Sequence, residues 1–292
     1  MGRSLYVECA SGISGDMTVG ALLDLGADEE KLKKVLASIP AEGYTVAITK
    51  VSKSGILCTD FDVQLDGAHE NHDHDMAYLY GHEHARLEEE DHDHKHGHHH
   101  HHDHDEDHDH GHGHHHHHEH RNLADVLAII RGTEMDERAR ALAEKIFTVV
   151  AEAESEAHGL PLDEVHFHEV GAIDSIVDVI AIAVCCQDVM EKESITDVIV
   201  KSVTEGYGTV RCQHGVLPVP VPAVTNIARA HGLPLRIGEA RGEYVTPTGA
   251  AFLAAVQTKD SLPEQMRIIK TGMGAGKRKQ TLPGFLRMMV VE

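Results

Sequence analysis

Apolar residues recur along the chain with two periods, one typical of strands and one typical of helices. Residues 44–51 and 58–65 have strand patterns, and Ser54 and Gly55 mark a turn between them, which predicts a β-hairpin. A further strand, residues 4–9, leads into a glycine-containing turn. Other strands are predicted at residues 198–203, 266–269 and 286–291.

Helical spacing is clearest in residues 136–158, which Gly159 closes, and in residues 172–190. The second of these contains the apolar run 177–186, so we expect this helix to be buried on most sides. Asn122 is placed to cap a helix that runs to residue 131. Other helices are predicted at residues 17–25, 28–38, 221–231 and 249–257.

Strands and helices alternate irregularly, which predicts an α/β or α+β fold with a mixed sheet flanked by helices. The chain has 292 residues, which allows one or two domains. We expect one main domain, formed by residues 1–66 and 121–292 and interrupted by an insertion at 67–120. The insertion offers almost no apolar surface to offset an ordering cost of roughly 1–2 kcal/mol per residue, so it is expected to be disordered.

The insertion is a histidine-rich tract interleaved with acidic residues. It holds 23 of the 28 histidines. Imidazole binds borderline divalent metals such as Ni(II), Cu(II), Zn(II) and Co(II), and the carboxylates raise the local cation concentration. The tract therefore indicates a metal reservoir or delivery arm; a solubilising linker is the alternative. Its longest runs are His98, His99, His100, His101 and His102, and His114, His115, His116, His117 and His118.

Charge and cysteine content narrow the class of protein. The formal net charge is −22, and residues 69–120 contribute 15 acidic residues against Arg86 and Lys95, so nucleic acid is not an expected partner. Five cysteines without a CxxC pair indicate neither a disulfide framework nor a zinc ribbon. No apolar run approaches the ~20 residues that cross a bilayer, and the expected location is the cytoplasm.

The segment from His166 to Asp178 is the densest group of candidate ligands. In an extended segment His166 and His168 point to one face, and Asp174 and Asp178 share one face of the following helix. With Glu169 they suit a divalent metal, with one group left as a base. The alternative is that the acids only complement the helix dipole and the histidines are structural.

A second candidate is the loop before the helix at 17–25. Ser11, Gly12, Ser14 and Gly15 let backbone N–H groups approach a bound anion, and Asp16 would repel a phosphate unless a cation intervened. The alternative is a tight turn in which Ser14 or Asp16 caps the helix.

Two further segments have the composition of binding loops. Residues 207–222 place His214, a candidate metal ligand, before three alternate prolines, which stiffen the chain into an extended approach to a helix. Thr246, Thr248 and Gly249 open another helix with hydroxyls and a glycine, which suits an anion. Ordinary turns are the alternative for both segments.

Four motifs taken together resemble the LarC family of nickel insertion proteins. They are SGISGDM at residues 11–17, HFHEVGAIDSIVDV at 166–179, GYGTVRCQHGVLPVPVPA at 206–223 and TPTGAA at 246–251, with the histidine-rich insertion between the first two. The resemblance covers nearly all of the chain outside the tract. Glu8 stands where an aspartate is expected after the first strand, which keeps the carboxylate as a possible metal ligand.

The resemblance implies a cyclometallase. Such an enzyme inserts Ni(II) into pyridinium-3,5-bisthiocarboxylic acid mononucleotide, forming two nickel–sulfur bonds and one nickel–carbon bond, and the product serves an apo lactate racemase-type enzyme. A ring proton must leave, which asks for a base such as His168 or Glu169. The substrate phosphate needs a cradle, for which the loops at 11–15 and 246–249 are candidates.

The family pattern also implies CTP, Mg²⁺ or Mn²⁺, and a homo-oligomer. Its members continue beyond Glu292 into a CTP-binding domain, which is expected here as a further domain or a separate chain. Residues 272–279 are a candidate nucleotide contact or a basic linker. The competing hypotheses are a nickel storage or delivery chaperone without chemistry of its own and a zinc or copper buffer.

Overall fold

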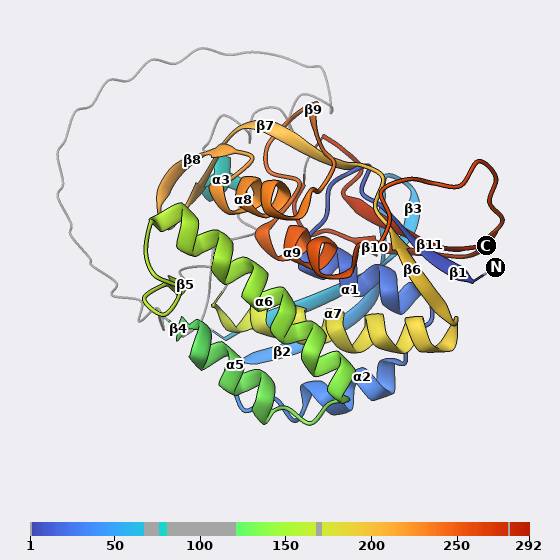
Figure 1. Cartoon of the computed structure of the whole chain (residues 1–292), viewed down its shortest axis with the longest axis horizontal. Helices are drawn as coiled ribbons and strands as arrows, with labels where there is room; N and C mark the ends of the chain where they lie inside the picture. Colours follow the sequence, from blue (N-terminus) through green and yellow to red (C-terminus); the bar gives the residue numbers. More distant parts are fainter. Residues whose placement is uncertain (1, 67–75, 81–120, 168–170, 280) are drawn as a thin grey trace, which may run out of the picture.

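The computed structural model describes residues 2–66, 76–80, 121–167, 171–279 and 281–292. A six-stranded mixed sheet forms its centre, in the order β2-β3-β10-β11-β1-β6. β1 (Arg3–Glu8) pairs antiparallel with β11 (Phe285–Val291) and parallel with β6 (Ile195–Ile199). This pairing brings the two ends of the chain side by side (Figure 1). The mixed α/β fold confirms the fold class that the sequence predicts.

The other half of this sheet contains the predicted hairpin. β2 (Tyr44–Lys53) and β3 (Ile56–Leu65) pair antiparallel around Ser54 and Gly55, both at positive φ. β10 (Ile268–Ala275) lies between β3 and β11. The hairpin is therefore confirmed, whereas the predicted strand 266–269 covers only the start of β10.

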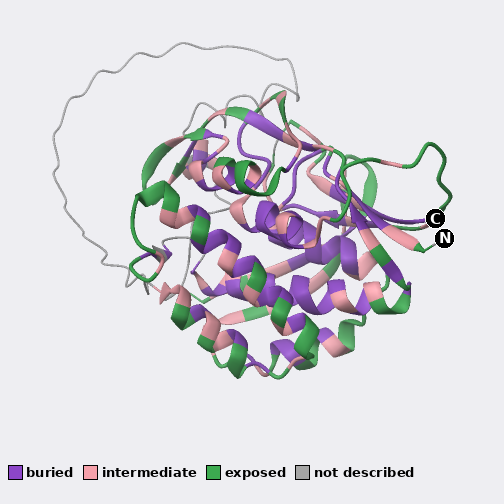
Figure 2. Ribbon diagram, viewed as in Figure 1, coloured by how far each residue is buried: buried purple, intermediate pink, exposed green. Residues whose placement is uncertain are grey.

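Helices cover one face of the sheet. They are α1 (Gly15–Asp24), α2 (Glu29–Leu36), α5 (Leu123–Gly132), α6 (Glu137–His158), α7 (Ile173–Lys192), α8 (Pro222–His231) and α9 (Pro247–Val256). α1 packs on β10, and α7 packs on both α1 and α6. α7 is buried along most of its length, as its apolar run predicts (Figure 2). Leu5 and Val7 of β1 face this helical core, whereas Tyr6 belongs to a small cluster separate from it.

Capping residues set the ends of two of these helices at the positions that the sequence predicts. The Asn122 side chain and Asp125 form a reciprocal capping box at the start of α5. α6 begins after Asp136, whose carboxylate accepts the N–H of Arg138, and ends at Gly159 in the left-handed conformation. Both predicted boundaries are confirmed.

A second sheet, β8-β7-β9, corrects the prediction of an extended loop at 207–222. β7 (Val203–Cys212) and β8 (Gly215–Val219) form an antiparallel hairpin, and β9 (Leu235–Arg241) pairs parallel with β7. Glycine, threonine and proline obscure the strand pattern there, although only Pro218 and Pro220 lie at or beside the edge strand β8, where a missing N–H is tolerated. The predicted strand 198–203 is also wrong in its bounds, because β6 ends at Ile199.

Part of the predicted insertion belongs to the folded protein. Residues 76–80 form the helix α3 (Met76–Tyr80), which packs on β7. Leu79 is buried, and the Tyr80 hydroxyl accepts the N–H of Glu243 at 3.0 Å. Two-residue strands β4 (Arg121–Asn122) and β5 (His166–Phe167) pair nearby. The remaining residues of the tract, including both long histidine runs, lie outside the described residues.

Glycines allow α1 to lie directly on β10. A Cβ atom at Gly274 would meet the Met17 carbonyl oxygen at 1.9 Å, and one at Gly272 would meet the Ala21 oxygen at 2.2 Å. Gly20 of α1 faces the sheet in the same way, because an ideal Cβ there would lie 2.4 Å from the Thr59 carbonyl oxygen. The glycines at 272 and 274 thus serve helix–sheet packing, which positions the start of α1.

Replacing Gly274 with Ala is expected to lower the free energy of unfolding by about 1–3 kcal/mol, because backbone atoms of α1 cannot yield to the added methyl group. Urea denaturation measures this difference. Gly238→Ala is the control, since its Cβ would meet the Thr204 methyl group at 3.3 Å and the Glu205 carbonyl oxygen at 3.4 Å, far longer than the contacts at Gly274. Equal stability of the two variants would contradict the packing argument.

Candidate functional site

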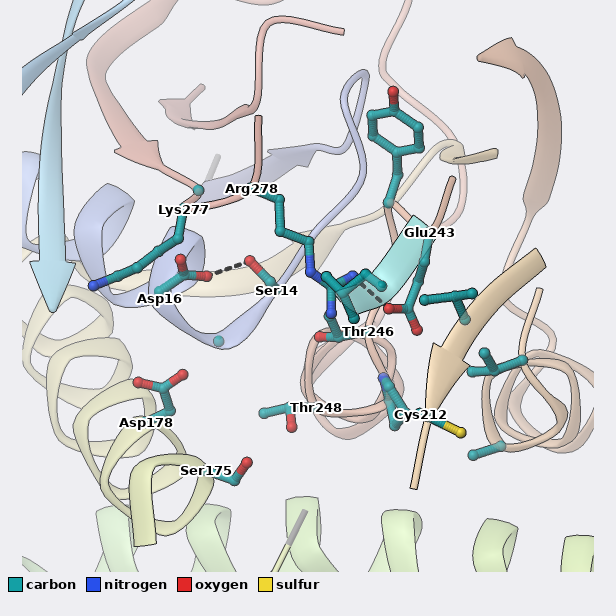
Figure 3. A pocket seen from close by; sticks show the side chains of 18 of the residues that line it. Ser14, Asp16, Ser175, Asp178, Cys212, Glu243, Thr246, Thr248, Lys277 and Arg278 are labelled. Atoms are coloured by element: carbon teal, nitrogen blue, oxygen red, sulfur yellow. Dashed lines mark hydrogen bonds and ion pairs between the residues drawn. The ribbon is translucent and has the colours of Figure 1, made fainter. Parts of the chain in front are cut away.

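A cavity of about 300 Å³ lies where the starts of α1, α7 and α9 meet the hairpin β7–β8. Figure 3 shows Asp178 on α7 and Cys212 on β7 on opposite sides of this cavity, with Thr248 of α9 between them. The four sequence motifs are far apart in the chain, and each contributes residues to the lining.

Two predicted binding loops form the cavity wall together. The N–H of Ile13 donates to the Tyr244 carbonyl at 2.9 Å, and the N–H of Thr246 donates to the Ile13 carbonyl at 3.1 Å. Gly12 lies at φ +81° with Tyr244 against its Cα, so a side chain there would clash. The loops before α1 and α9 are therefore held side by side.

The start of α1 fixes Asp16 in the cavity wall. The buried Asp16 carboxylate accepts hydrogen bonds from the N–H of Met17, at 2.8 Å, and from the hydroxyl of Ser14. Ser14 is the N-cap residue but its side chain makes no cap hydrogen bond, and Asp16 lies in the first turn, where its carboxylate satisfies one N–H of the helix terminus. The cavity lining also includes Ser11, Ser14, Gly15 and Asp16.

Asp178 closely approaches the start of α1. An ideal Cβ at Gly15 would lie 2.3 Å from Asp178 Oδ2, so only glycine leaves room for this carboxylate. Burial, followed by repulsion from Asp16 and Asp174, raises the pKa of Asp178 well above its usual range. Asp16, Asp174 and Asp178 all line the cavity. They form a concentration of negative charge that a cation would relieve.

The start of α9 provides the opposite chemistry. Thr246 caps the helix by accepting the N–H of Gly249 at 3.3 Å, and Thr248 follows in the first turn. Gly249 packs against the Ile13 carbonyl, 2.5 Å from an ideal Cβ. The helix terminus and its hydroxyls can therefore face an anion in the cavity.

Two cations follow β10 into the cavity lining. Lys277 forms an ion pair with Asp62, and Arg278 forms one with Glu243. Burial lowers the pKa of Lys277. Residues 272–279, a predicted nucleotide contact or basic linker, thus combine helix-packing glycines with cavity-lining cations.

A buried carboxyl group, Glu205, supports the wall behind Glu243. Its Oε1 accepts the N–H groups of Gly206 at 2.8 Å, Tyr244 at 2.7 Å and Val245 at 3.2 Å, whereas the buried Oε2 has no hydrogen-bond partner among the described residues. Burial raises the pKa of Glu205 to about 7. The neutral carboxyl is therefore the form that the fold favours.

Stability should fall as the pH rises from about 4.5 to about 7, because the unfolded chain loses the Glu205 proton while the folded protein keeps it. This contribution is roughly 3 kcal/mol, and Glu205→Gln should remove it. Urea unfolding at several pH values tests the difference in slope. The exposed Glu239→Gln is the control and should keep the wild-type slope; a wild-type slope in Glu205→Gln would contradict the assignment.

Nitrogen and sulfur donors gather at the tip of the β7–β8 hairpin. The Cys212 Sγ lies 3.8 Å from the Nδ1 of His214, and the His214 ring lies 4.9 Å from the ring of His158 at the end of α6. Glu154 Oε2 is 3.4 Å from His158 Nε2. Burial, and then His158, lower the pKa of His214.

The structure brings most of the sequence-predicted site residues together. The exceptions are Glu8, which forms an ion pair with Arg287 and does not line the cavity, and Gly12 and Gly249, which serve packing behind it. His168, Glu169 and the His166 side chain lie outside the described residues, so their roles stay predictions. Among the residues that the structure describes, no three His, Cys, Asp or Glu side chains are already arranged to hold a metal ion.

No motif in the sequence marks Glu154 and His158, which line the cavity, or Glu205, which lies behind it. Glu205 is a single acid within a strand and carries no motif, and Glu154 and His158 sit in an ordinary amphipathic helix. The spacing of four between Glu154 and His158 was the available signal, but it has meaning only beside Cys212 and His214.

The fold and the cavity define an α/β protein with a ligand-sized cavity in which carboxylates oppose helix starts and cations. The chain belongs to the nickel insertion protein family, which matches residues 5–292. This confirms the resemblance to LarC. No solved structure matches the chain.

Relatives in several bacteria are named pyridinium-3,5-bisthiocarboxylic acid mononucleotide nickel insertion protein. The one from Alkaliphilus metalliredigens is 48% identical over 100% of this chain and 61% of its own length. Those from Geobacillus kaustophilus and Acetivibrio thermocellus are 36% and 35% identical, over 99% and 95% of this chain and 60% and 57% of their own lengths. The chain thus spans about three fifths of these relatives. Within the described residues, no helix has both the length and the hydropathy to span a membrane.

Proposed function

We propose that this cavity is where Ni(II) is inserted into pyridinium-3,5-bisthiocarboxylic acid mononucleotide. The observation that carries the proposal is the convergence of four separate motifs on one cavity with cationic and anionic walls. Its volume of about 300 Å³ lies at the lower end of the range for small-molecule sites. The names of the relatives supply the substrate.

The start of α9 is proposed to bind the substrate phosphate. Thr246 and Thr248 contribute hydroxyls, and the helix dipole favours negative charge at this point. Arg278 lines the same cavity, where its guanidinium pairs with Glu243 and can exchange this partner for the phosphate. The start of α1 is less suited to the phosphate, because Asp16 and Asp178 lie there.

The carboxylates of α1 and α7 are proposed to compensate the positive charges of the reaction. The pyridinium ring and Ni(II) are both cationic, and burial together with repulsion from Asp16 and Asp174 raises the pKa of Asp178. As the nickel–carbon bond forms, the ring C–H bond breaks and its proton passes to a base. His168 or Glu169, which follow the cavity-lining Phe167, stay the proposed acceptors.

CTP and a divalent cation remain part of the proposal through the resemblance. Oxygen donors such as Asp16 and Asp174 suit Mg²⁺ or Mn²⁺, so the residues present fit such a cation at the α1 wall. The relatives are longer than this chain, and we place the CTP site in the part of them that this chain does not cover. An apo lactate racemase-type enzyme is the proposed recipient of the product, and a homo-oligomer is the proposed assembly.

The histidine tract is proposed to collect Ni(II) for the cavity. Because α3 packs on β7, a deletion that tests the tract should keep residues 76–80 and replace only residues 81–120 with a short glycine–serine linker. Turnover should then be unchanged at saturating Ni(II) and should fall about tenfold or more when the metal is scarce, because effective concentration is lost.

The assay uses the chain with substrate, Ni(II), CTP and Mg²⁺, with and without the remaining portion of the Alkaliphilus metalliredigens relative added as a second polypeptide. Formation of the nickel adduct is followed by mass spectrometry. No turnover by the undeleted chain in either mixture would contradict the proposed reaction and favour the nickel storage or delivery chaperone. Metal content after growth in mixed-metal medium tests the zinc or copper buffer.

A further inference from the structure

The donors at the β7–β8 hairpin tip form a group that the steps above do not use. Cys212 and His214 flank Gln213 at the tip, with Sγ and Nδ1 3.8 Å apart. Glu154 and His158 are four residues apart on α6 and therefore share one face of the helix. All four line the same cavity as Asp178, and Cys212 lies across it from Asp178 (Figure 3).

Two of these donors already have the separation expected for ligands of one metal ion. Two donors bound at about 2.1 Å (nitrogen) and 2.3 Å (sulfur) lie about 3–4 Å apart. The Cys212 Sγ and the His214 Nδ1 are 3.8 Å apart, so they need almost no movement to share an ion. The His158 ring lies 4.9 Å from the His214 ring, within reach of a side-chain rotation.

Glu154 has the position of a partner that orients a ligand. Metal-binding histidines commonly donate their second ring N–H to a carboxylate, which fixes the tautomer. Glu154 Oε2 lies 3.4 Å from His158 Nε2, so we assign Nδ1 as the metal-binding atom of His158. Glu154 is thus a positioning residue rather than a ligand.

We propose that Cys212, His214 and His158 form the site that first receives Ni(II) in the cavity and passes it to the substrate. A thiolate and two imidazoles suit borderline divalent metals, and three protein ligands leave positions open for the substrate sulfurs. The identity of the ion as Ni(II) rests on the proposed function. Because the three donors come together only around the ion, the site can release it.

Binding and transfer conserve charge and atoms in a simple way. As Ni(II) arrives, the Cys212 thiol loses its proton to solvent and a nickel–sulfur bond forms. The two thiocarboxylate sulfurs of the substrate then replace the protein ligands, and Cys212 takes up a proton from solvent again. No oxidation or reduction occurs.

The test is the thiolate-to-nickel charge-transfer absorption of the full chain during titration with NiCl₂. The tract contains no cysteine, and Cys9, Cys58, Cys185 and Cys186 are buried, so this band reports Cys212 even while the tract binds nickel. Wild type should develop the band, and Cys212→Ser should lose it. His214→Ala and His158→Ala should weaken the binding that the band reports by about tenfold or more. Cys58→Ala is the control and should keep the wild-type band.

Absence of the band in wild type, or its persistence in Cys212→Ser with unchanged circular dichroism, would overturn the site. The proposed function is judged separately, by turnover. A band that behaves as expected in a chain without turnover would leave the receiving site standing and the insertion activity refuted. Turnover without any band would refute the receiving site and leave the insertion activity standing.

Discussion

Replacing Asp178 with Asn is expected to lower the rate of nickel insertion by about 10²–10³-fold while making the metal-free protein more stable. The loss of rate follows because a carboxylate that compensates positive charge in a buried site is removed. The gain in stability, about 1–3 kcal/mol, follows because burial and then repulsion from Asp16 and Asp174 disfavour this carboxylate and raise its pKa.

Asp188→Asn on the same helix is the matched control, because the pKa of Asp188 is shifted in the opposite direction to that of Asp178. Burial opposes ionisation there too, but hydrogen bonds from Lys192 and from the Asp28 N–H lower the pKa of Asp188 overall. Asp188→Asn should therefore reduce stability at neutral pH and leave turnover unchanged. Thermal unfolding and the insertion assay measure both effects. A less stable Asp178→Asn, or one with wild-type turnover, would contradict the role given to this carboxylate.

The second large effect is expected at the start of α9. Thr248→Val should weaken binding of the mononucleotide about 10- to 100-fold, because a hydrogen bond to a charged phosphate contributes about 1.5–3 kcal/mol. The substitution keeps the shape of a side chain that is only 7% exposed. Stability should change little, since the cap of α9 is Thr246.

Thr148→Val is the control for this experiment. Its hydroxyl donates to the Glu144 carbonyl at 2.8 Å on α6, away from the cavity lining. Calorimetric titration with the mononucleotide should give the wild-type dissociation constant for this variant. Equal affinities of Thr248→Val and wild type would exclude Thr248 from the phosphate site.

The sequence predicts those elements that are determined by residues close together in the chain, such as turns and helix caps. The hairpin β2–β3 follows from alternation around Ser54 and Gly55, and α6 follows from Asp136 and Gly159 at its ends. The loops before α1 and α9 were predicted separately as anion sites. Their direct hydrogen bonding through Ile13 was not predictable, because it depends on how distant strands pair.

The remaining site depends on contacts between segments that carry no shared pattern. The sequence predicts a loop where the β7–β8 hairpin lies, because its glycines and prolines mask the strand alternation, so the proximity of His214 to His158 is not predictable. Glu8 was predicted as a ligand from its place after the first strand, but Arg287 on the neighbouring strand β11 pairs with it. Position in the sequence alone does not show that His214 lies beside His158 or that Glu8 is paired with an arginine.

Calorimetric titration of the protein lacking residues 81–120 with Ni(II), in the presence and absence of the pyridinium mononucleotide, tests the central claim most directly. The proposed cavity should retain one nickel site after the tract is removed, and the mononucleotide should tighten it, because its sulfurs complete the coordination. Loss of all nickel binding with the tract, together with no effect of the mononucleotide, would mean that the cavity does not bring metal and substrate together.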